Sequence, residues 1–273
     1  MDLSDVRLFA LITGASSGIG AAYAERLAAR GYDLILVARR RERLEALAER
    51  LRQDYTRQIE IHPADLGAPR DLERIETLLR TREDIAILVN NAGLGALGPS
   101  VSADPQAVQS LIAINVLALT RLSLAAAPAF AARDQGAIIN IGSVIAVIPS
   151  PGGAAYSGSK AYVLNFSRSL QIEFSKSNVK VQVVMPGPVR SEFFGDQTPP
   201  FPDDLFMSAE TLVDIALRAL DQGELVCWPT LHDVQAWTTF EDARRSLARA
   251  VSQDAIPPER YGLGALGTER RSP

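Results

Sequence analysis

The amino-acid sequence predicts an α/β protein, built as a single-domain, doubly wound (Rossmann) parallel sheet with helices on both faces. Short apolar runs alternate with helical segments along the chain, and a glycine-rich turn joins the first run to the first helix. Because these runs are apolar throughout, they are typical of parallel strands that are covered on both sides. A chain of 273 residues is long enough for one large domain of this class.

The strands and helices follow one another in a regular series. Strands are expected at Leu8–Thr13, Asp33–Ala38, Ile59–Pro63, Ile85–Val89, Gly136–Ile141, Lys180–Met185 and Glu224–Trp228. Helices are expected through Arg30 and at Arg39–Arg57, Pro69–Arg82, Pro105–Ala132, Ala155–Ser175 and Ser208–Gln222. Leucines at 44, 47 and 51 have the spacing of one helix face. Gly31 is a natural residue to end the first helix.

The domain organisation is expected to be simple. One catalytic domain is predicted over residues 1–255, in which residues 195–240 form a substrate loop and the C-terminal region. Gly195–Pro202 is rich in Pro, Gly and Phe, which is typical of a mobile loop. Residues 256–273 carry Pro, Gly and Arg without periodicity, so a flexible tail is expected there.

The composition argues against several classes of protein. Apolar residues make up 47% of the chain, which is too many for global disorder, and a net charge of −4 does not fit nucleic-acid binding. The single cysteine, Cys227, cannot form an internal disulfide, so a reducing, cytoplasmic compartment is expected. The N-terminus lacks the basic region of a signal peptide. The apolar stretch Leu111–Ala132 contains Asn115, Arg121 and Pro128, which favours a buried helix over a membrane span.

The turn after the first strand predicts a nucleotide site. Its glycines have the spacing Gly14-x-x-x-Gly18-x-Gly20, which differs from the usual G-x-G-x-x-G fingerprint. Gly14 would allow the tight turn, Gly18 the approach of a pyrophosphate, and Gly20 close packing of helix on strand. The following helix N-terminus would face the anion. Such a turn can also be a plain connector, but its place after the first strand favours a dinucleotide.

The end of the second strand indicates which dinucleotide is bound. An acidic residue there would bind a ribose 2′-hydroxyl, but the sequence has Ala38-Arg39-Arg40 and no carboxylate before Glu42. Guanidinium groups match a 2′-phosphate bidentately. The arginines could instead be the solvated first turn of the next helix, where the helix dipole disfavours them. NADP(H) is therefore expected over NAD(H), with Arg39 as the main ligand because it is nearer the strand.

A tyrosine and a lysine on one helix face form a candidate acid–base pair. Tyr156 and Lys160 stand four residues apart, thirteen residues after Ser143. A free phenol has a pKa of about 10, and a nearby ammonium favours the phenolate and lowers that pKa. The pair would then be a general acid and base near neutral pH. Alone, the Tyr-x-x-x-Lys spacing is also common on helix surfaces, so its meaning depends on the motifs before it.

In this order the motifs resemble those of the classical short-chain dehydrogenases/reductases, from about Arg7 to Gly195 and more loosely to Trp228. The resemblance includes the glycine loop, Asp65 in Pro-Ala-Asp-Leu, Asn90-Asn91-Ala92-Gly93, Asn115 in Ile-Asn-Val, Ser143, Tyr156, Lys160 and Pro186-Gly187. The family often has Thr where this chain has Ser191, so a hydroxyl is kept. The arginine pair is similar to that of NADP-preferring bacterial members.

The resemblance implies an enzyme that moves a hydride between NADP(H) and a carbonyl or secondary alcohol. It implies a catalytic tetrad in which Ser143 bonds the carbonyl oxygen, Tyr156 donates the proton, Lys160 depresses the tyrosine pKa and holds the nicotinamide ribose, and Asn115 holds a water. The implied cofactor-binding residues are Gly14, Ser16, Ser17, Gly18, Ile19, Gly20, Arg39, Arg40, Asp65, Leu66, Asn91, Ala92, Gly93, Tyr156, Lys160, Pro186, Gly187, Val189 and Ser191. Asp65 could instead cap the helix that follows it.

Loops at the carboxyl ends of the strands would form the mouth of the site. These loops are Leu94–Pro99, Val144–Gly153, Pro188–Phe206 and Pro229–Trp237. They carry Ile145, Val147, Ile148, Phe193, Phe194, Phe201 and Phe206, with Arg190 as the obvious arginine. A medium-sized apolar ketone or alcohol is therefore expected, although the aromatic residues could equally hold the loop down as a lid.

Assembly, metals and other functions complete the expectations. Small residues on the two long helices, and the resemblance, suggest a homodimer or homotetramer. His62 and His232 lie outside the predicted site, so no metal is expected. An NADP(H) sensor without chemistry would be expected to lack Tyr156 or Lys160, and a sugar-nucleotide epimerase usually has a larger C-terminal domain than follows Gly195.

Overall fold

The computed structural model describes residues 7–95, 98–149, 151–194, 201–253 and 258–261. The chain divides into two compact units, Met1–Thr230 and Leu231–Pro273. The sheet lies in the first unit, so the predicted extent of the catalytic domain, 1–255, stays a prediction beyond Thr230. Most of the predicted loop Gly195–Pro202 and most of the predicted tail 256–273 lie outside the described residues.

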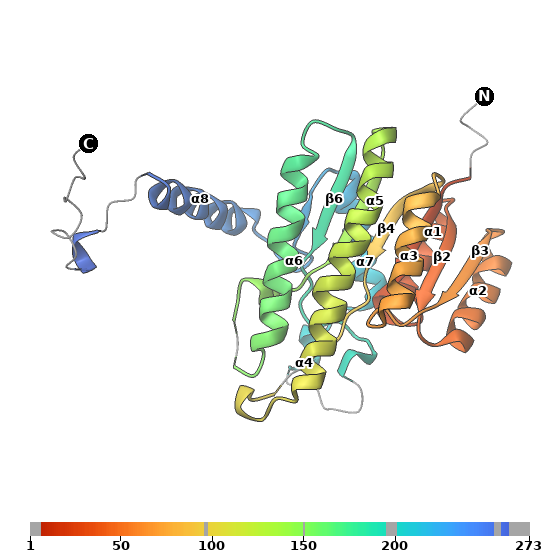
Figure 1. Cartoon of the computed structure of the whole chain (residues 1–273), viewed down its shortest axis with the longest axis horizontal. Helices are drawn as coiled ribbons and strands as arrows, with labels where there is room; N and C mark the ends of the chain where they lie inside the picture. The colour runs from red at the N-terminus through yellow and green to blue at the C-terminus, as the bar shows by residue number, and fades with distance from the viewer. Residues whose placement is uncertain (1–6, 96–97, 150, 195–200, 254–257, 262–273) are drawn as a thin grey trace, which may run out of the picture. The chain divides into compact units, whose positions relative to one another are not determined.

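The first unit is built on a parallel sheet of seven strands in the order β3-β2-β1-β4-β5-β6-β7 (Figure 1). The strands are β1 (Phe9–Thr13), β2 (Asp33–Ala38), β3 (Ile59–Pro63), β4 (Ile85–Asn90), β5 (Gly136–Ile141), β6 (Val179–Val184) and β7 (Val226–Cys227). The strand order reverses between β1 and β4, and such a switch point leaves a crevice at the carboxyl ends of the strands. The predicted doubly wound fold is confirmed.

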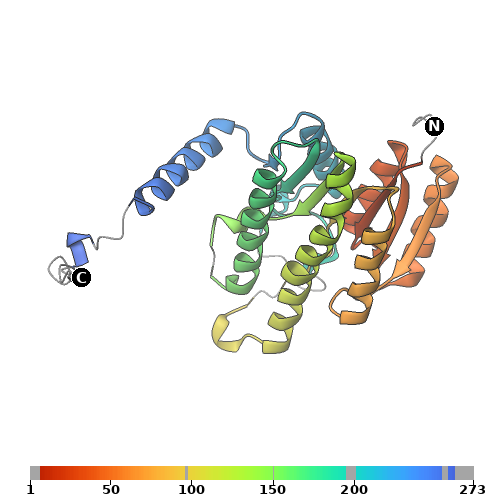
Figure 2. The same ribbon diagram turned by 45° about the horizontal axis from the view of Figure 1, so that its top comes forward.

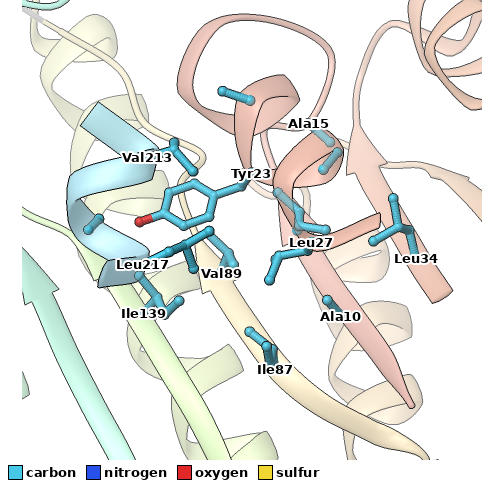
Figure 3. Packing of buried hydrophobic residues seen from close by; sticks show 14 of the residues in the cluster. Ala10, Ala15, Tyr23, Leu27, Leu34, Ile87, Val89, Ile139, Val213 and Leu217 are labelled. Carbon is cyan, nitrogen blue, oxygen red and sulfur yellow. The ribbon is translucent and has the colours of Figure 1, made fainter. Parts of the chain in front are cut away.

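Helices cover both faces of this sheet (Figures 1 and 2). One face carries α1 (Gly18–Ala29), α2 (Arg41–Tyr55) and α7 (Ala209–Asp221), and the other carries α3 (Pro69–Thr81), α5 (Leu119–Arg133) and α6 (Ala154–Glu173). Along β1, Ile12 belongs to the first core and Leu11 to the second, because alternate side chains of a strand point to opposite faces. The fully buried Tyr23 of α1 packs between Val213 and Leu217 of α7 and the sheet (Figure 3).

Two helices differ from their predicted bounds in ways that affect the site. The second helix begins at Arg41, not at Arg39, so Arg39 and Arg40 belong to the loop after β2. The predicted helix Pro105–Ala132 is continuous in direction, but it consists of α4 (Pro105–Ile112), a π-helical segment (Ala113–Ala118) and α5. Short 3₁₀ turns occur at Ser100–Ser102, Val144–Ala146, Glu192–Phe194, Asp203–Leu205 and Glu259–Tyr261.

The long helical stretch Pro105–Arg133 is unusually apolar. Within the described residues, Pro105–Arg133 is the helical stretch that is long and apolar enough to cross a membrane by length and composition. Its α5 part packs on β4, β5 and α3.

The second unit holds α8 (Val234–Val251), a helix that was not predicted from the sequence. Asp233 caps its N-terminus, and the Asp233 carboxylate accepts a hydrogen bond from the Gln235 amide at 2.9 Å.

Candidate cofactor cleft and active site

A cavity of about 1100 Å³ lies at the carboxyl ends of the central strands. Its volume is slightly above the usual range for small-molecule sites, roughly 300–1,000 Å³, so it can hold a large ligand and a second small one. Nearly all of the predicted site residues line it, and the exceptions are Gly20 and Asn115. The lining residues that were predicted are Gly14, Ser16, Ser17, Gly18, Ile19, Arg39, Arg40, Asp65, Leu66, Asn91, Ala92, Gly93, Ser143, Tyr156, Lys160, Pro186, Gly187, Val189 and Ser191.

The glycine turn between β1 and α1 has the conformation that a phosphate cradle requires. Gly14 and Gly18 have φ angles of 65° and 53°, which residues other than glycine rarely adopt. A Cβ on Gly20 would lie 2.3 Å from the carbonyl oxygen of Gly14, so only glycine lets the helix start this close to the strand. The N-terminus of α1 therefore faces the cavity, where unpaired backbone N–H groups suit an anion.

The ends of β1 and β4 are tied together beneath this turn. The Thr13 hydroxyl accepts hydrogen bonds from the Asn91 and Ala92 amides, each at 3.0 Å, and donates to the Val89 carbonyl at 3.2 Å. The Asn91 side chain donates to the carbonyl oxygens of Thr13 and Gly14 at 2.9 and 3.2 Å. These bonds fix the floor of the crevice, which is the position predicted for Asn91 and Ala92.

The adenosine end of the predicted site carries the arginine pair. Arg40 reaches the glycine turn: its Nη2 donates to Ser16 Oγ at 3.0 Å and to Ser17 Oγ at 2.9 Å. Arg39 is exposed and makes no hydrogen bond or ion pair among the described residues. Both line the cavity, and both lie before α2, so the alternative that they are its solvated first turn is wrong.

Two charged residues that the sequence analysis missed meet at this end. Glu192 accepts a hydrogen bond from Arg40 Nη1 at 2.7 Å and a second one from Arg43. These two guanidinium groups, Arg43 first, lower the pKa of Glu192 to about 2. Arg43 lies three residues after Arg40, a spacing that places both on one side of a helix start, and this was the available signal. Nothing in the local sequence indicated Glu192.

Asp65 follows β3 at the edge of the cavity and is exposed. Its carboxylate accepts a hydrogen bond from the Gly67 amide at 2.9 Å, and its own amide donates to Asp71 at 2.8 Å. The first residue before α3 is Ala68, and no side chain caps that helix. The alternative that Asp65 caps the following helix is therefore wrong, and its second carboxylate oxygen is available to a ligand.

The catalytic candidates meet across the carboxyl end of β5. Ser143 lies just after β5; its hydroxyl donates to the Pro186 carbonyl at 3.3 Å and accepts from the Ile145 amide at 3.4 Å. Tyr156 lies in the first turn of α6, near enough to Ser143 for the serine hydroxyl to lower its pKa in part. The two hydroxyl groups thus stand together in the cavity, as predicted from the motif order.

The pKa of Tyr156 departs from the prediction. Burial raises it to about 12, and the hydrogen bond with Ser143 lowers it only in part. The predicted lowering by Lys160 is wrong in this structure. The ammonium lies 5.6 Å from the centre of the phenol ring and is hydrogen-bonded to the Ile141 carbonyl at 2.8 Å. The ammonium is thus directed at the Ile141 carbonyl oxygen and not at the phenol oxygen. Desolvation of the phenol therefore has the largest effect on the pKa of Tyr156.

Lys160 is buried on the second turn of α6. With 7% of its surface exposed, its ammonium is desolvated, and burial lowers its pKa to about 8. The group is thus a cation at pH 7 that can lose its proton in mildly alkaline solution. It also lies next to Gly93, where an added Cβ would come 4.0 Å from Nζ.

Asn115 is buried behind the cavity wall, in the π-helical segment between α4 and α5. Its side-chain oxygen accepts from the Leu94 amide at 2.8 Å, and its Nδ2 donates to the Leu94 carbonyl at 2.9 Å and to Ser159 Oγ at 3.3 Å. The amide therefore fixes the chain after β4 against α6. π-Helical turns recur at functional sites, and the predicted water at Asn115 stays a prediction.

The remaining predicted cofactor residues follow β6. Pro186, Gly187 and Val189 line the cavity opposite the glycine turn, and Val189 pairs with Met207 in an isolated bridge. Ser191 lies against the turn, since a Cβ on Gly18 would come 3.1 Å from Ser191 Cβ. Its hydroxyl donates to the Val189 carbonyl at 3.3 Å, which fixes the side chain. Ser191 lines the cavity, so the hydroxyl predicted at this position is part of the site.

The substrate side of the cavity is mainly apolar. Its walls include Leu94, Gly95, Pro99, Val144, Ile145, Pro151, Phe193 and Phe201. Phe193 packs on the catalytic candidate, with ring centres of Phe193 and Tyr156 5.5 Å apart. Of the other predicted wall residues, Val147, Ile148 and Phe206 do not line the cavity, and the Phe194 side chain is outside the described part. Arg190 donates to the Asp203 carbonyl at 3.0 Å and is not in the wall.

The described residues contain no cluster of side chains that could bind a metal ion. No group of three or more His, Cys, Asp or Glu side chains is placed there to hold an ion. Cys227 is buried on β7, and burial raises its thiol pKa to about 12, so it is a packed apolar residue and not a nucleophile.

Comparisons with known proteins agree with this geometry. The family model of short chain dehydrogenases matches residues 8–200. A solved structure described as a short-chain dehydrogenase from Sphingobium yanoikuyae in complex with NADPH has a TM-score of 0.88 and 44% sequence identity, and the match covers 93% of this chain and all of that one. The bulky-bulky ketone specific alcohol dehydrogenase from Comamonas testosteroni has a TM-score of 0.86 and 41% identity, with 94% and 99% covered.

Among curated proteins, human 17-beta-hydroxysteroid dehydrogenase type 3 is 39% identical over 180 residues. That match covers 65% of this chain and 58% of the relative. This chain therefore spans less than two thirds of the length of that relative.

Proposed function

We propose, since this chain belongs to the short-chain dehydrogenase family, that it is an NADP(H)-dependent oxidoreductase that interconverts a ketone and a secondary alcohol. The observation that carries the proposal is the shared cavity. Ser143, Tyr156 and Lys160 line one end, the glycine turn lines its middle, and Arg40 lies at the other end. A dinucleotide that spans this cavity would place its reactive ring beside the two hydroxyl groups.

The cavity fits the phosphorylated dinucleotide better than its unphosphorylated form. The glycine turn, which needs glycine at position 20 for α1 to start this close to β1, presents the helix N-terminus to the cavity, and this suits the pyrophosphate. Two guanidinium groups, Arg39 and Arg40, follow β2 where an acidic residue would bind a free ribose hydroxyl. The similar Sphingobium enzyme was solved with NADPH, which supports the same choice here.

In the proposed reaction the bound cofactor supplies the hydride, and the protein orients the carbonyl and supplies the proton. The Ser143 hydroxyl, now donating to the Pro186 carbonyl, would turn to donate to the substrate oxygen. Tyr156, whose pKa is about 12, keeps its proton at neutral pH and would transfer it to that oxygen as charge develops there. Each positioned donor at a developing oxyanion contributes about 3–4 kcal/mol to lowering the barrier.

Lys160 and Asn115 are proposed to assist proton transfer by Tyr156. Lys160 is mainly protonated at pH 7, and its positive charge near the ring would stabilise the phenolate that forms when Tyr156 gives its proton to the substrate oxygen. The family resemblance also implies that it holds the ribose hydroxyl groups. Asn115 fixes Leu94, and with it the wall beside the ammonium. We propose that a water on Asn115 connects this ammonium with solvent.

The proposed substrate is a medium-sized apolar ketone or the matching alcohol. The wall near Tyr156 consists mainly of apolar residues, among them Ile145, Phe193 and Phe201. The carboxylates that line the cavity are those of Asp65 and Glu192, and Glu192 is paired with arginines. The similar Comamonas enzyme is described as specific for bulky-bulky ketones, which supports a substrate with apolar groups on both sides of the carbonyl.

A substrate panel with both reduced cofactors tests the proposal. Aryl alkyl ketones, cyclic ketones and small charged oxoacids would be compared with NADPH and with NADH, with product analysis by chromatography. Turnover of apolar ketones with a clear preference for NADPH is expected. Turnover confined to charged oxoacids would overturn the substrate class, and preference for NADH would overturn the cofactor choice.

We propose further that the chain forms a homodimer or homotetramer in the cytoplasm. Apolar side chains are exposed along the helices that cover one face of the sheet, namely Leu117, Leu124 and Ile172, with 50%, 53% and 75% of their surface exposed. The single cysteine, buried and unpaired, suits a reducing compartment. Light scattering after size exclusion would give the mass, and a monomer at micromolar concentration would contradict the assembly.

A further inference from the structure

Three consecutive residues reach both ends of the cleft. Ser191 lies against Gly18 of the glycine turn, Glu192 pairs with the arginines after β2, and the ring of Phe193 lies 5.5 Å from that of Tyr156. A Cβ on Gly95 would come 2.7 Å from the Phe193 ring, so this ring fills the space between the two sides of the mouth. Residues 191–193 thus form one short strap from the phosphate end to the catalytic end.

The Glu192 carboxylate uses both oxygens on this contact. Its Oε2 accepts from Arg40 Nη1 at 2.7 Å, and its Oε1 accepts from Arg43. The other nitrogens of the Arg40 fork bond Ser16 and Ser17. All three nitrogens of Arg40 are therefore engaged, and its Nη1 is paired with an anion that belongs to the protein and that lines the same cavity.

A phosphate on the ribose at the end of β2 could bind Arg39, which is unpaired among the described residues, and would compete with Glu192 for Arg40, the other arginine that lines the cavity. Carboxylates and phosphates are recognised by the same planar fork of donors, and two such anions repel each other when they are close together. A ribose that carries only hydroxyl groups makes no such demand. Glu192 therefore stands in the way of one cofactor and not of the other.

We infer that Glu192 is a built-in competitor of the cofactor 2′-phosphate, and that its displacement from Arg40 and Arg43 moves Phe193 away from Tyr156. This inference rests on the proposed function and deepens it. Binding of the phosphorylated cofactor would release the strap, so that the apolar substrate reaches the phenol only afterwards.

Binding of adenine nucleotide fragments tests the competition without any chemistry. Glu192→Gln keeps the shape of the side chain and removes its charge. The variant is expected to bind adenosine 2′,5′-bisphosphate about three- to tenfold more tightly than the wild type by calorimetry, the effect of losing one or two exposed ion pairs. Binding of adenosine 5′-monophosphate should change less than about twofold, because it has no 2′-phosphate.

A matched control removes the general effect of charge. Glu45→Gln deletes a carboxylate of α2, the helix that carries Arg43. Glu45 pairs with Arg41 and does not line the cavity. This change should leave the affinity for the bisphosphate unchanged. An equal gain in both variants, or an unchanged or weaker affinity in Glu192→Gln, would overturn the inference. Thermal melting of each variant shows that the fold is kept.

Hydrogen exchange follows the strap itself. The Phe193 amide donates to Ser191 Oγ at 3.4 Å, so a peptide covering residues 189–193 reports on its release. Exchange should become faster with the bisphosphate and stay unchanged with the monophosphate, whereas slower exchange with the bisphosphate would overturn the inference. If the wild type binds neither NADPH nor NADH, the proposed function fails as well. Bisphosphate binding that ignores Glu192→Gln overturns this inference alone.

Discussion

The Lys160 ammonium donates a hydrogen bond to the backbone carbonyl oxygen of Ile141 at 2.8 Å, at the carboxyl end of β5. The same strand end leads to Ser143, so one peptide segment positions both the cation and one of the two hydroxyl groups. Because the ammonium is buried, its pKa falls to about 8, while burial raises that of Tyr156 to about 12. The two groups therefore titrate in separate ranges, and their contributions can be measured apart.

The first prediction concerns the pH dependence of activity. The value of kcat/KM for ketone reduction should fall above about pH 8, because Lys160 loses its proton there while Tyr156 keeps its own. Steady-state rates between pH 6 and 10 would show this, with buffers of constant ionic strength. Lys160→Arg retains a cation and should show no break near pH 8. A break that appears only above about pH 10 in the wild type would assign it to the phenol instead.

The second prediction concerns stability and follows from the same shifts. Lys160 has a lower pKa in the folded state, so the unfolded chain binds more protons between about pH 8 and 10.5, and the free energy of unfolding should rise with pH in that window. For Tyr156 the sign is opposite, and stability is lost between pH 10 and about 12. Urea unfolding of the wild type and of Lys160→Met at several pH values isolates the first effect. An identical pH slope for both proteins would contradict it.

The third prediction tests the glycine turn. Gly20→Ala should lower the free energy of unfolding by about 1–3 kcal/mol and weaken NADPH binding, because the new methyl group would lie 2.3 Å from the Gly14 carbonyl. Gly158→Ala is the control: it lies on the exposed side of α6 with nothing within 4 Å. It should stabilise the helix by about 0.5–1 kcal/mol. Unchanged stability and affinity in Gly20→Ala would show that the turn can relax.

The fourth prediction concerns a buried carboxylate that joins two helices. Glu76 of α3 has 1% of its side chain exposed and is bonded by Arg121 of α5 and, at 3.3 Å, by Arg80. Glu76→Gln should cost about 1–3 kcal/mol of stability, because a buried partner of a guanidinium group loses its charge. Glu73→Gln, on the exposed side of the same helix, should change stability by less than about 0.5 kcal/mol. Equal effects of both changes would contradict a special role for Glu76.

The strands could be predicted because each is an uninterrupted apolar run next to a turn. Phe9–Thr13 and Gly136–Ile141 were found in this way almost to the residue. Helix starts were harder, since arginine is a good helix former, and the contacts that Arg40 makes with Ser16, Ser17 and Glu192 join residues far apart in the sequence. The π-helical turn around Asn115 adds one residue to a turn without changing the apolar pattern, so periodicity could not show it.

The site could be predicted in part for the same reason. Glycine spacing and the order of Ser143, Tyr156 and Lys160 are local patterns, and the structure brings these three residues to the same cavity as Gly14 and Gly18. The contact between Arg43 and Glu192 joins residues 149 positions apart. The sequence around neither residue predicts that the two side chains meet. The direction of the Tyr156 pKa shift depends on burial against the distance to a cation, and sequence gives neither quantity.

The most direct test of the account is Tyr156→Phe, assayed with NADPH and an apolar aryl ketone. The account predicts that kcat falls by about 10²–10⁴-fold, because the proton donor is lost, while the dissociation constant for NADPH, measured by calorimetry, stays within about twofold of the wild type. Retained turnover in this folded variant would contradict the account, because the phenol would then not be the proton donor.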